Sequence, residues 1–126
     1  GVDVRIITPH VPDKPPVHAV TRSYYPILLQ SGVRIYEYTP GFMHSKAAIA
    51  DDKVGVVGSV NLDYRSLYMA FENAVWLYGT DSVLQIKEDF LETLSLCQEV
   101  HLDQYSGLGA HQRLKWSLLR LLAPLL

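Results

Sequence analysis

The sequence predicts an α/β fold in which a sheet is flanked by helices. Two observations carry this prediction. Short apolar segments with strand character alternate along the chain with segments whose apolar residues recur at helical spacing. The 126 residues are also 48% hydrophobic, which is enough to bury a core and excludes a disordered chain. We therefore expect one globular domain over residues 1–126.

The first third of the chain predicts a strand, a helix and a second strand. Residues 2–8 form an apolar strand, and residues 10–16 form a loop because they contain three prolines. A helix follows, in which Val17, Val20 and Tyr24 share one face. Pro26 falls within it, so we expect a kink or two short helices. Residues 33–38 then predict the next strand.

The middle of the chain predicts a hairpin, a further strand and a second helix. Residues 44–50 and 54–58 form the two hairpin strands, joined by a polar turn at residues 51–53. Residues 70–78 are apolar and predict another strand. Residues 82–98 predict a helix with a capping box of Ser82 and Gln85. Its predicted buried face consists of Val83, Ile86, Phe90, Leu94 and Cys97.

The last segment, residues 107–126, predicts an amphipathic helix rich in leucine. It is too short and too charged to span a bilayer, which requires about 20 apolar residues. Two interpretations remain open. The helix packs on the domain or on another part of a longer protein, or it lies in a membrane interface with Trp116 as an anchor and its basic residues facing anionic lipid.

The strongest functional signal is one motif, which occurs once. It reads His44-x-Lys46-(x)4-Asp51-(x)6-Gly58-Ser59-x-Asn61. A histidine can attack phosphorus or protonate a leaving oxygen, and a lysine, a hydroxyl and an amide can hold phosphate oxygens. The motif therefore predicts a site for phosphodiester chemistry.

The spacing places these side chains together. Residues i and i+2 of a strand point to the same face, which applies to His44 and Lys46. Ser59 and Asn61 repeat this spacing, and Gly58 lets the backbone approach a ligand. The alternatives are that Lys46 is a surface lysine and that Ser59 and Asn61 only close a turn.

Two carboxylates compete for a role beside His44. Asp51 is part of the motif and a catalytic candidate, but it lies at a predicted turn and on the opposite face, which favours a structural role. Glu72 is a charged residue in an apolar segment, where it is costly unless it is paired. We therefore expect Glu72 to have a partner.

Charge and composition limit the other possibilities. The net charge of −2 argues against a nucleic-acid partner, and the single Cys97 cannot form an intrachain disulfide. His10, His18, His101 and His111 have no ligand-like spacing. We therefore expect neither a metal site nor a cofactor.

The motif resembles the HKD motif of the phospholipase D superfamily. The segments 58–66 and 71–73, together with residues 12–16, 21–29 and 32–38, resemble bacterial cardiolipin synthases. The resemblance covers roughly residues 2–122. It implies a phospholipase D-like domain with a mixed sheet flanked by helices on both faces, and it implies that Glu72 hydrogen-bonds the catalytic histidine. Because members carry two HKD motifs, the chain resembles the C-terminal half of such an enzyme.

The resemblance also implies a function. One histidine forms a phosphatidyl-histidine and another protonates the leaving alcohol, so that two phosphatidylglycerol molecules give cardiolipin and glycerol. The expected partners are phosphatidylglycerol, the N-terminal HKD half, a membrane surface and a possible second copy. We expect the full-length enzyme in the cell membrane with its catalytic part on the cytoplasmic side, and this chain to be soluble. Alternatives are another superfamily phosphodiesterase, a nuclease or phospholipase, or a half-domain that is inert alone.

Overall fold

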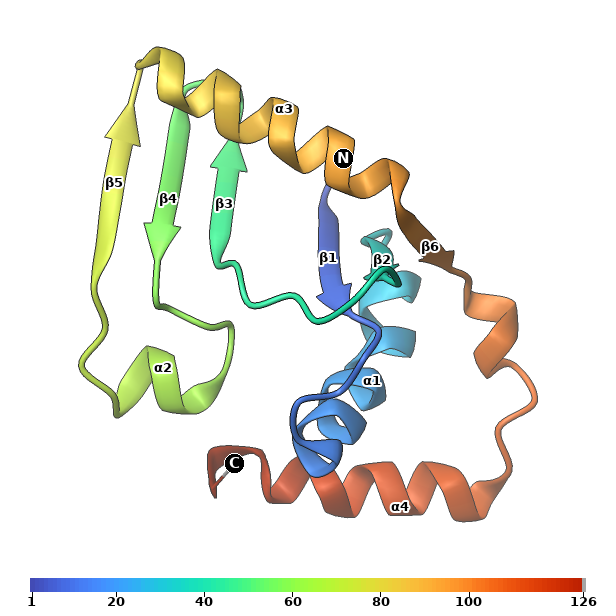
Figure 1. The fold of residues 1–126 in the computed structure, drawn as a ribbon. Coiled ribbons are helices and arrows are strands. Elements are labelled where there is room, and N and C mark those ends of the chain that lie inside the picture. The colour runs from blue at the N-terminus through green and yellow to red at the C-terminus, as the bar shows by residue number, and fades with distance from the viewer. Residues whose placement is uncertain (126) are drawn as a thin grey trace. The chain divides into compact units, whose positions relative to one another are not determined.

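The computed structural model describes residues 1–125 and confirms the α/β class. The chain divides into two compact units (Figure 1). The first unit combines residues 1–43 with the segment from residue 97 onward, and the second unit is residues 44–96. Each unit contains one three-stranded sheet. That the whole chain forms one domain stays a prediction.

The first unit is built on a parallel strand pair. Strand β1 (Arg5–Pro9) leads into helix α1 (Pro15–Gln30), which returns the chain to strand β2 (Arg34–Tyr38). The two strands pair in parallel, and strand β6 (Cys97–Val100) pairs antiparallel with β2. This sheet of order β1-β2-β6 is mixed, as the resemblance implied, but the expectation of a single sheet is wrong because the strands divide between two sheets.

Helix α1 and the strands bury a small core. Tyr25, Ile35 and Val100 are almost completely buried, and Leu28, Leu29, Val33 and Tyr105 pack around them. The helix continues through Pro26, so the prediction of two short helices is wrong. Proline removes one backbone hydrogen bond, but Tyr25 before Pro26 and Leu28 after it are held by the core.

The C-terminal segment of the first unit is helical. The 3₁₀ helix η1 (Leu102–Tyr105) precedes helix α4 (Ala110–Leu121), and a short 3₁₀ turn η2 (Ala123–Leu125) follows. Helix α4 packs against α1 in the same unit (Figure 1). Leu126, the last residue of the predicted amphipathic helix, lies outside the described residues. Within residues 1–125, no helix combines the length and apolar character needed to cross a bilayer.

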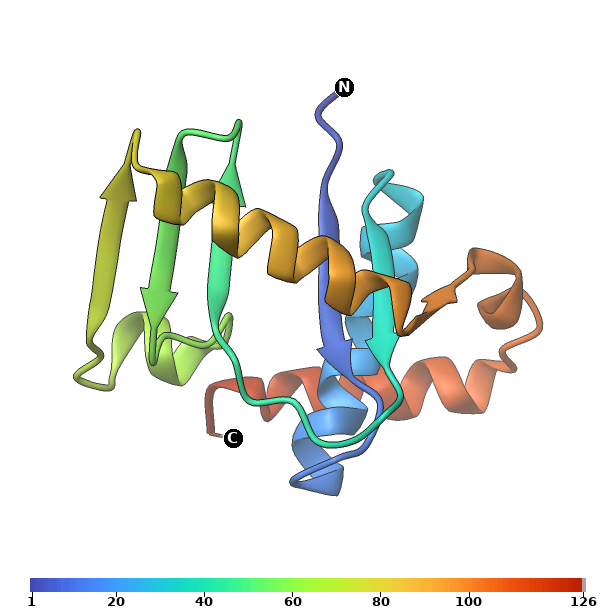
Figure 2. The same cartoon turned by 45° about the horizontal axis from the view of Figure 1, so that its top comes forward.

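The second unit is an antiparallel sheet with helices. Strands β3 (Ala47–Ala50), β4 (Val54–Gly58) and β5 (Ala74–Tyr78) pair in the order β3-β4-β5. Figure 2 shows helix α3 (Asp81–Ser95) running across these strands, and helix α2 (Tyr64–Tyr68) beyond the end at which β4 stops. The predicted hairpin is thus confirmed, but β3 begins at Ala47, so His44 and Lys46 precede the strand instead of sharing one of its faces.

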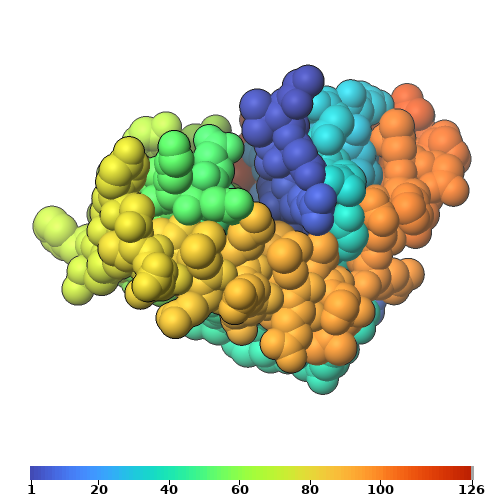
Figure 3. Space-filling model, turned by 90° about the horizontal axis from the view of Figure 1, so that it is seen from above, coloured from blue at the N-terminus to red at the C-terminus, as the bar shows by residue number. Residues whose placement is uncertain are grey.

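Helix α3 is anchored on the middle of this sheet. Val83 is fully buried, and its Cγ2 would lie 3.4 Å from a Cβ placed on Gly55 of β4. Lys87 forms an ion pair of 2.5 Å with Asp52, so the turn between β3 and β4 lies against α3 (Figure 3). The predicted capping box is wrong because the helix begins one residue earlier, with Thr80 at the N-cap and no side-chain cap bond.

The turn of the hairpin has an unusual backbone. Asp51 and Asp52 have φ values of 51° and 57°, and the Lys53 N–H donates to the Ala50 carbonyl over 3.1 Å. Two successive positive φ angles are the mark of type I′ turns, which suit the right-handed twist of the flanking strands. Aspartate tolerates this region better than most residues. The prediction of a turn at these residues is confirmed.

Two boundaries, the start of β5 and the end of α3, differ from the prediction, and helix α2 was not predicted. Strand β5 begins at Ala74, four residues later than predicted, so Glu72 lies outside it. Helix α2 was not predicted because its five residues are too few to show a period; its N-cap Asp63 accepts from the Ser66 N–H over 2.7 Å. Helix α3 ends at Ser95, and Cys97 belongs to β6, where pairing with β2 overrides the helical pattern.

Candidate functional site

The motif residues gather at one edge of the β3-β4-β5 sheet. Because β4 runs antiparallel to both neighbours, the end of β4 lies beside the beginnings of β3 and β5. Lys46 directly precedes β3 and His44 lies two residues earlier; Ser59 directly follows β4. Glu72 comes just before β5. Four of the predicted site residues therefore come from three segments that meet at one edge.

Gly58 fixes how closely these segments approach. Its N–H donates to the Lys46 carbonyl over 3.1 Å. A Cβ at this position would lie 2.2 Å from the Asn73 carbonyl oxygen and 2.6 Å from the Ala74 Cα. Both of these are backbone atoms, so only glycine fits. The predicted close approach at Gly58 thus exists, but the partner is the chain itself.

Ser59 is held by the segment that precedes β5. Its N–H donates to the Asn73 carbonyl over 2.9 Å, and its Oγ accepts from the Asn73 N–H over 3.0 Å. The hydroxyl donates to Glu72 Oε2 in a short hydrogen bond. A hydroxyl has one proton, so Ser59 donates to a phosphate oxygen only when this bond to Glu72 opens.

Glu72 is a half-exposed carboxylate with a defined electrostatic environment. The hydroxyls of Ser59 and Ser66 hold the pKa of Glu72 below its ordinary value, and the nearby charge of Lys46 acts in the same direction. The side chain is therefore an anion at neutral pH. The partners that Glu72 has in the structure are the hydroxyls of Ser59 and Ser66.

Lys46 carries a positive charge near Glu72 and is hydrogen-bonded to the histidine segment. Its Nζ donates to the His44 carbonyl over 2.8 Å, so the ammonium group bends back over the backbone of the motif. The His44 side chain is exposed. The edge thus combines an exposed imidazole with an ammonium, a carboxylate and a hydroxyl. Direct orientation of His44 by Glu72 stays a prediction.

Two motif residues remain, Asp51 and Asn61. Asp51 occupies the turn at the opposite end of β3 from His44, which agrees with a structural position for this carboxylate. Asn61 is exposed in the loop between β4 and α2. Sequence reasoning missed Asn73 and Ser66 as parts of this edge. The sequence gives little indication of their contacts, because Asn73 bonds to Ser59 and Ser66 bonds to Glu72, each in another segment of the chain.

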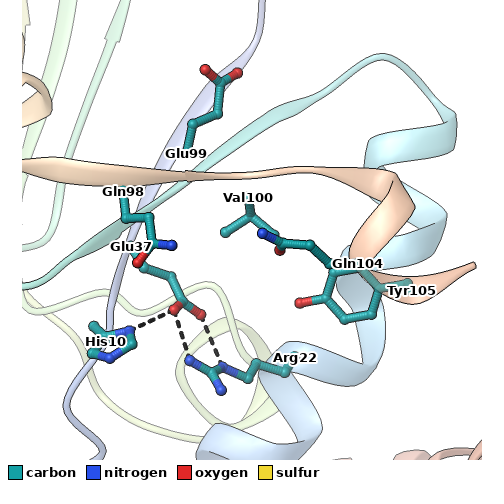
Figure 4. A pocket seen from close by; sticks show the side chains of 8 residues that line it. All are labelled: His10, Arg22, Glu37, Gln98, Glu99, Val100, Gln104 and Tyr105. Carbon is teal, nitrogen blue, oxygen red and sulfur yellow. Dashed lines mark hydrogen bonds and ion pairs between the residues drawn. The ribbon is translucent and has the colours of Figure 1, made fainter. Parts of the chain in front are cut away.

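A second polar cluster lies in the first unit, at the carboxyl ends of β1 and β2. Glu37 is buried and accepts from Arg22 Nε over 2.9 Å, from a second Arg22 nitrogen over 2.7 Å and from Tyr25 over 3.2 Å. His10 Nδ1 lies 2.7 Å from Glu37 Oε2. Figure 4 shows Arg22 and His10 converging on this carboxylate.

This cluster forms the floor of an open pocket of about 210 Å³. Its other lining residues are Gln98, Glu99, Val100, Gln104 and Tyr105, of which Glu99 points its side chain away from Glu37 (Figure 4). Burial tends to raise the pKa of Glu37, but the hydrogen bonds from Arg22 and His10 outweigh it and the pKa is lowered. Sequence reasoning missed this cluster, although a glutamate between two tyrosines of a strand was a usable signal.

Within residues 1–125, no group of three or more histidine, cysteine, aspartate or glutamate side chains is placed to hold a metal ion.

Comparison with known proteins identifies relatives across the whole chain. Residues 1–94 match the family model described as cardiolipin synthase, PLD-like domain. All 126 residues align with cardiolipin synthase 2 of Bacillus anthracis at 44% identity and with cardiolipin synthases of Halalkalibacterium halodurans and Geobacillus kaustophilus at 42% and 41%. The chain spans about a quarter of these relatives, 24–25% of their length. No solved structure matches the chain.

The Glu37 cluster predicts a pH-dependent contribution to stability. Glu37→Gln should lower the free energy of unfolding at pH 7 by about 1–3 kcal/mol, because Arg22 and His10 lose a charged acceptor. The pKa of Glu37 is lower in the folded than in the unfolded state, so its contribution is present above about pH 4.5 and is lost as the pH falls through the folded value.

Urea unfolding of both proteins at pH 7 and pH 3.5 measures this difference. Glu99→Gln is the matched control, since this carboxylate lies on the neighbouring strand and points away from the cluster (Figure 4). An equal loss for Glu37→Gln at both pH values would show that the charge of Glu37 is not what stabilises the fold.

Proposed function

Since the chain belongs to the phospholipase D-like family of cardiolipin synthases, we propose that it forms one histidine-bearing half of a phosphatidyltransferase site. The substrate is phosphatidylglycerol, and the products are cardiolipin and glycerol. The observation that carries the proposal is the gathering of His44, Lys46 and Ser59 at one sheet edge, in a chain aligned over its full length with cardiolipin synthases.

The chemistry assigns a step to each side chain. In one half-reaction, a histidine nitrogen forms a bond to phosphorus while the bond from phosphorus to the glycerol oxygen breaks, and the other histidine gives its proton to that oxygen. In the second half-reaction, a hydroxyl of another phosphatidylglycerol attacks phosphorus and gives its proton back to that other histidine, while the bond from phosphorus to the first histidine breaks. His44 supplies one of the two imidazoles. Lys46 and Asn61 neutralise or bind the non-bridging oxygens.

Ser59 and Glu72 act together in this proposal. When phosphate enters, the Ser59 hydroxyl turns its proton from Glu72 to a phosphate oxygen, where one such donor contributes about 2.7–4 kcal/mol to the transition state. The released Glu72 carboxylate is then available to accept from an imidazole N–H and to stabilise the imidazolium. The short bond from Ser59 to Glu72 supports this exchange because it shows that the two groups are within reach.

The same proposal gives the surroundings of the site. The second imidazole comes from the N-terminal HKD half of the same protein, or from a second copy of this chain. The full-length enzyme works at the cell membrane, where its lipid substrate is, with the catalytic part on the cytoplasmic side. The names of the relatives favour a lipid substrate over a nucleic acid, and so does the net charge of −2.

The first test removes the imidazole. In the full-length enzyme, His44→Ala should reduce turnover of phosphatidylglycerol vesicles by at least about a thousandfold, because no other group replaces a covalent nucleophile or its acid partner. Cys97→Ala, in β6 of the first unit, is the control and should keep near-normal turnover. Thin-layer separation of cardiolipin measures both. Turnover of single-stranded DNA in place of lipid would favour the nuclease alternative instead.

A second test compares the two carboxylates. Glu72→Gln should lower turnover more than Asp51→Asn, because Glu72 lies at the edge with Ser59 and Lys46 while Asp51 lies in the turn at the far end of β3. Thermal melting of both variants separates a loss of chemistry from a loss of fold. If Asp51→Asn loses more activity at equal stability, the two roles are reversed.

A third test uses the 126-residue chain alone. In-line displacement requires a nucleophile and an acid on opposite sides of phosphorus, and one His44 cannot occupy both positions. We therefore expect little or no cardiolipin formation by the monomer. Mass in solution and turnover are measured together over a range of concentrations. Turnover that increases with dimerisation would show that a second copy completes the site, whereas robust turnover by a strict monomer contradicts the requirement for two histidines.

A further inference from the structure

Helix α4 uses one face to pack within the first unit. The Trp116 ring lies 5.9 Å from the Tyr105 ring, and the Arg120 guanidinium lies 5.7 Å from the centre of the Tyr24 ring on α1. Ala123 is buried directly after the helix. This face is therefore occupied, and the Trp116 ring lies against Tyr105 of η1.

The opposite face carries an exposed leucine stripe, defined as Leu114, Leu118 and Leu121. These side chains are 60%, 56% and 74% exposed. Residues four and three apart lie on one face of a helix, so the three form a continuous row. Leu122 and Leu125 are also exposed next to its C-terminal end. An apolar row of this length on a helix surface indicates a binding surface.

The charges around the leucine stripe have one sign. Arg113 and Lys115 are the neighbours of Leu114, and at 3.6 residues per turn each lies about 100° from it, on opposite sides of the stripe. Both are exposed. Residues 107–126 contain no aspartate or glutamate, although the whole chain has a net charge of −2. The positive charge is therefore local to this helix and borders its apolar row on both sides.

We propose that the leucine stripe lies in the headgroup region of an anionic phospholipid bilayer, with α4 parallel to the surface and Arg113 and Lys115 on lipid phosphates. An apolar row between two cations matches acyl chains below a layer of negative charge. A second copy of the chain fits less well, because two such faces would bring like charges together. The inference concerns membrane docking and is independent of the catalytic proposal.

The test is flotation of the 126-residue chain with vesicles of phosphatidylcholine, with and without 30% phosphatidylserine, an anionic lipid that is not the proposed substrate. Binding should require phosphatidylserine and weaken with added salt. Arg113→Gln with Lys115→Gln should reduce binding about 25-fold, since each basic residue near an anionic surface contributes about fivefold. Leu118→Ala with Leu121→Ala should reduce it by at least about tenfold, because these side chains leave the acyl region.

The matched control is Leu84→Ala with Leu91→Ala, two leucines of α3 that are 45% and 43% exposed. This variant should bind like the unmodified chain, and circular dichroism should show equal helix content in all variants. Absence of binding to phosphatidylserine vesicles would overturn the inference, as would unchanged binding by the Leu118 and Leu121 variant. Self-association that this variant abolishes, without any vesicle binding, would overturn it by assigning the stripe to a protein contact.

Discussion

The approach of two backbone segments at Gly58 sets the geometry of the candidate site. A single Cβ at this position would overlap the carbonyl of Asn73, so the end of β4 and the beginning of β5 meet at a distance that only glycine allows. The paired hydrogen bonds between Ser59 and Asn73 depend on this distance. They in turn place the Ser59 hydroxyl against Glu72. The hydrogen bond that lowers the pKa of Glu72 therefore depends on the close backbone contact at Gly58.

Glu37 and Glu72 both belong to polar clusters, but they differ in burial and in their hydrogen-bond partners. Glu37 is buried, and Arg22, His10 and Tyr25 occupy its oxygens, so it is a fixed part of the first unit. Glu72 is half-exposed and held by hydroxyl donors, whose bonds exchange at low cost. A half-exposed carboxylate such as Glu72 suits a site where protons change partners. A buried carboxylate such as Glu37, with its oxygens occupied, suits a structural role.

The sequence predicted the hairpin and its turn because residue spacing controls both. It also predicted that His44, Lys46 and Ser59 lie together, but from spacing within strands; in the structure His44 and Lys46 precede β3, and the antiparallel pairing of β3 with β4 brings the segments to one edge. It failed where distant residues decide the outcome. Strand β6 reads as the end of a helix until β2 is present to pair with it, and the bonds of Glu72 come from residues 59 and 66. Pro26 indicated a break that the core around Tyr25 prevents.

The division of the chain into units has a consequence for the order of folding. The second unit is continuous in sequence, and its hairpin joins residues only a few positions apart, so it can form as soon as residues 44–96 have left the ribosome. The first unit must wait, because Val100 completes a core begun by Tyr25 and Ile35. Until β6 arrives, one edge of β2 is unpaired. A chain that stops before residue 97 would therefore expose that edge permanently, and we expect it to be prone to aggregation.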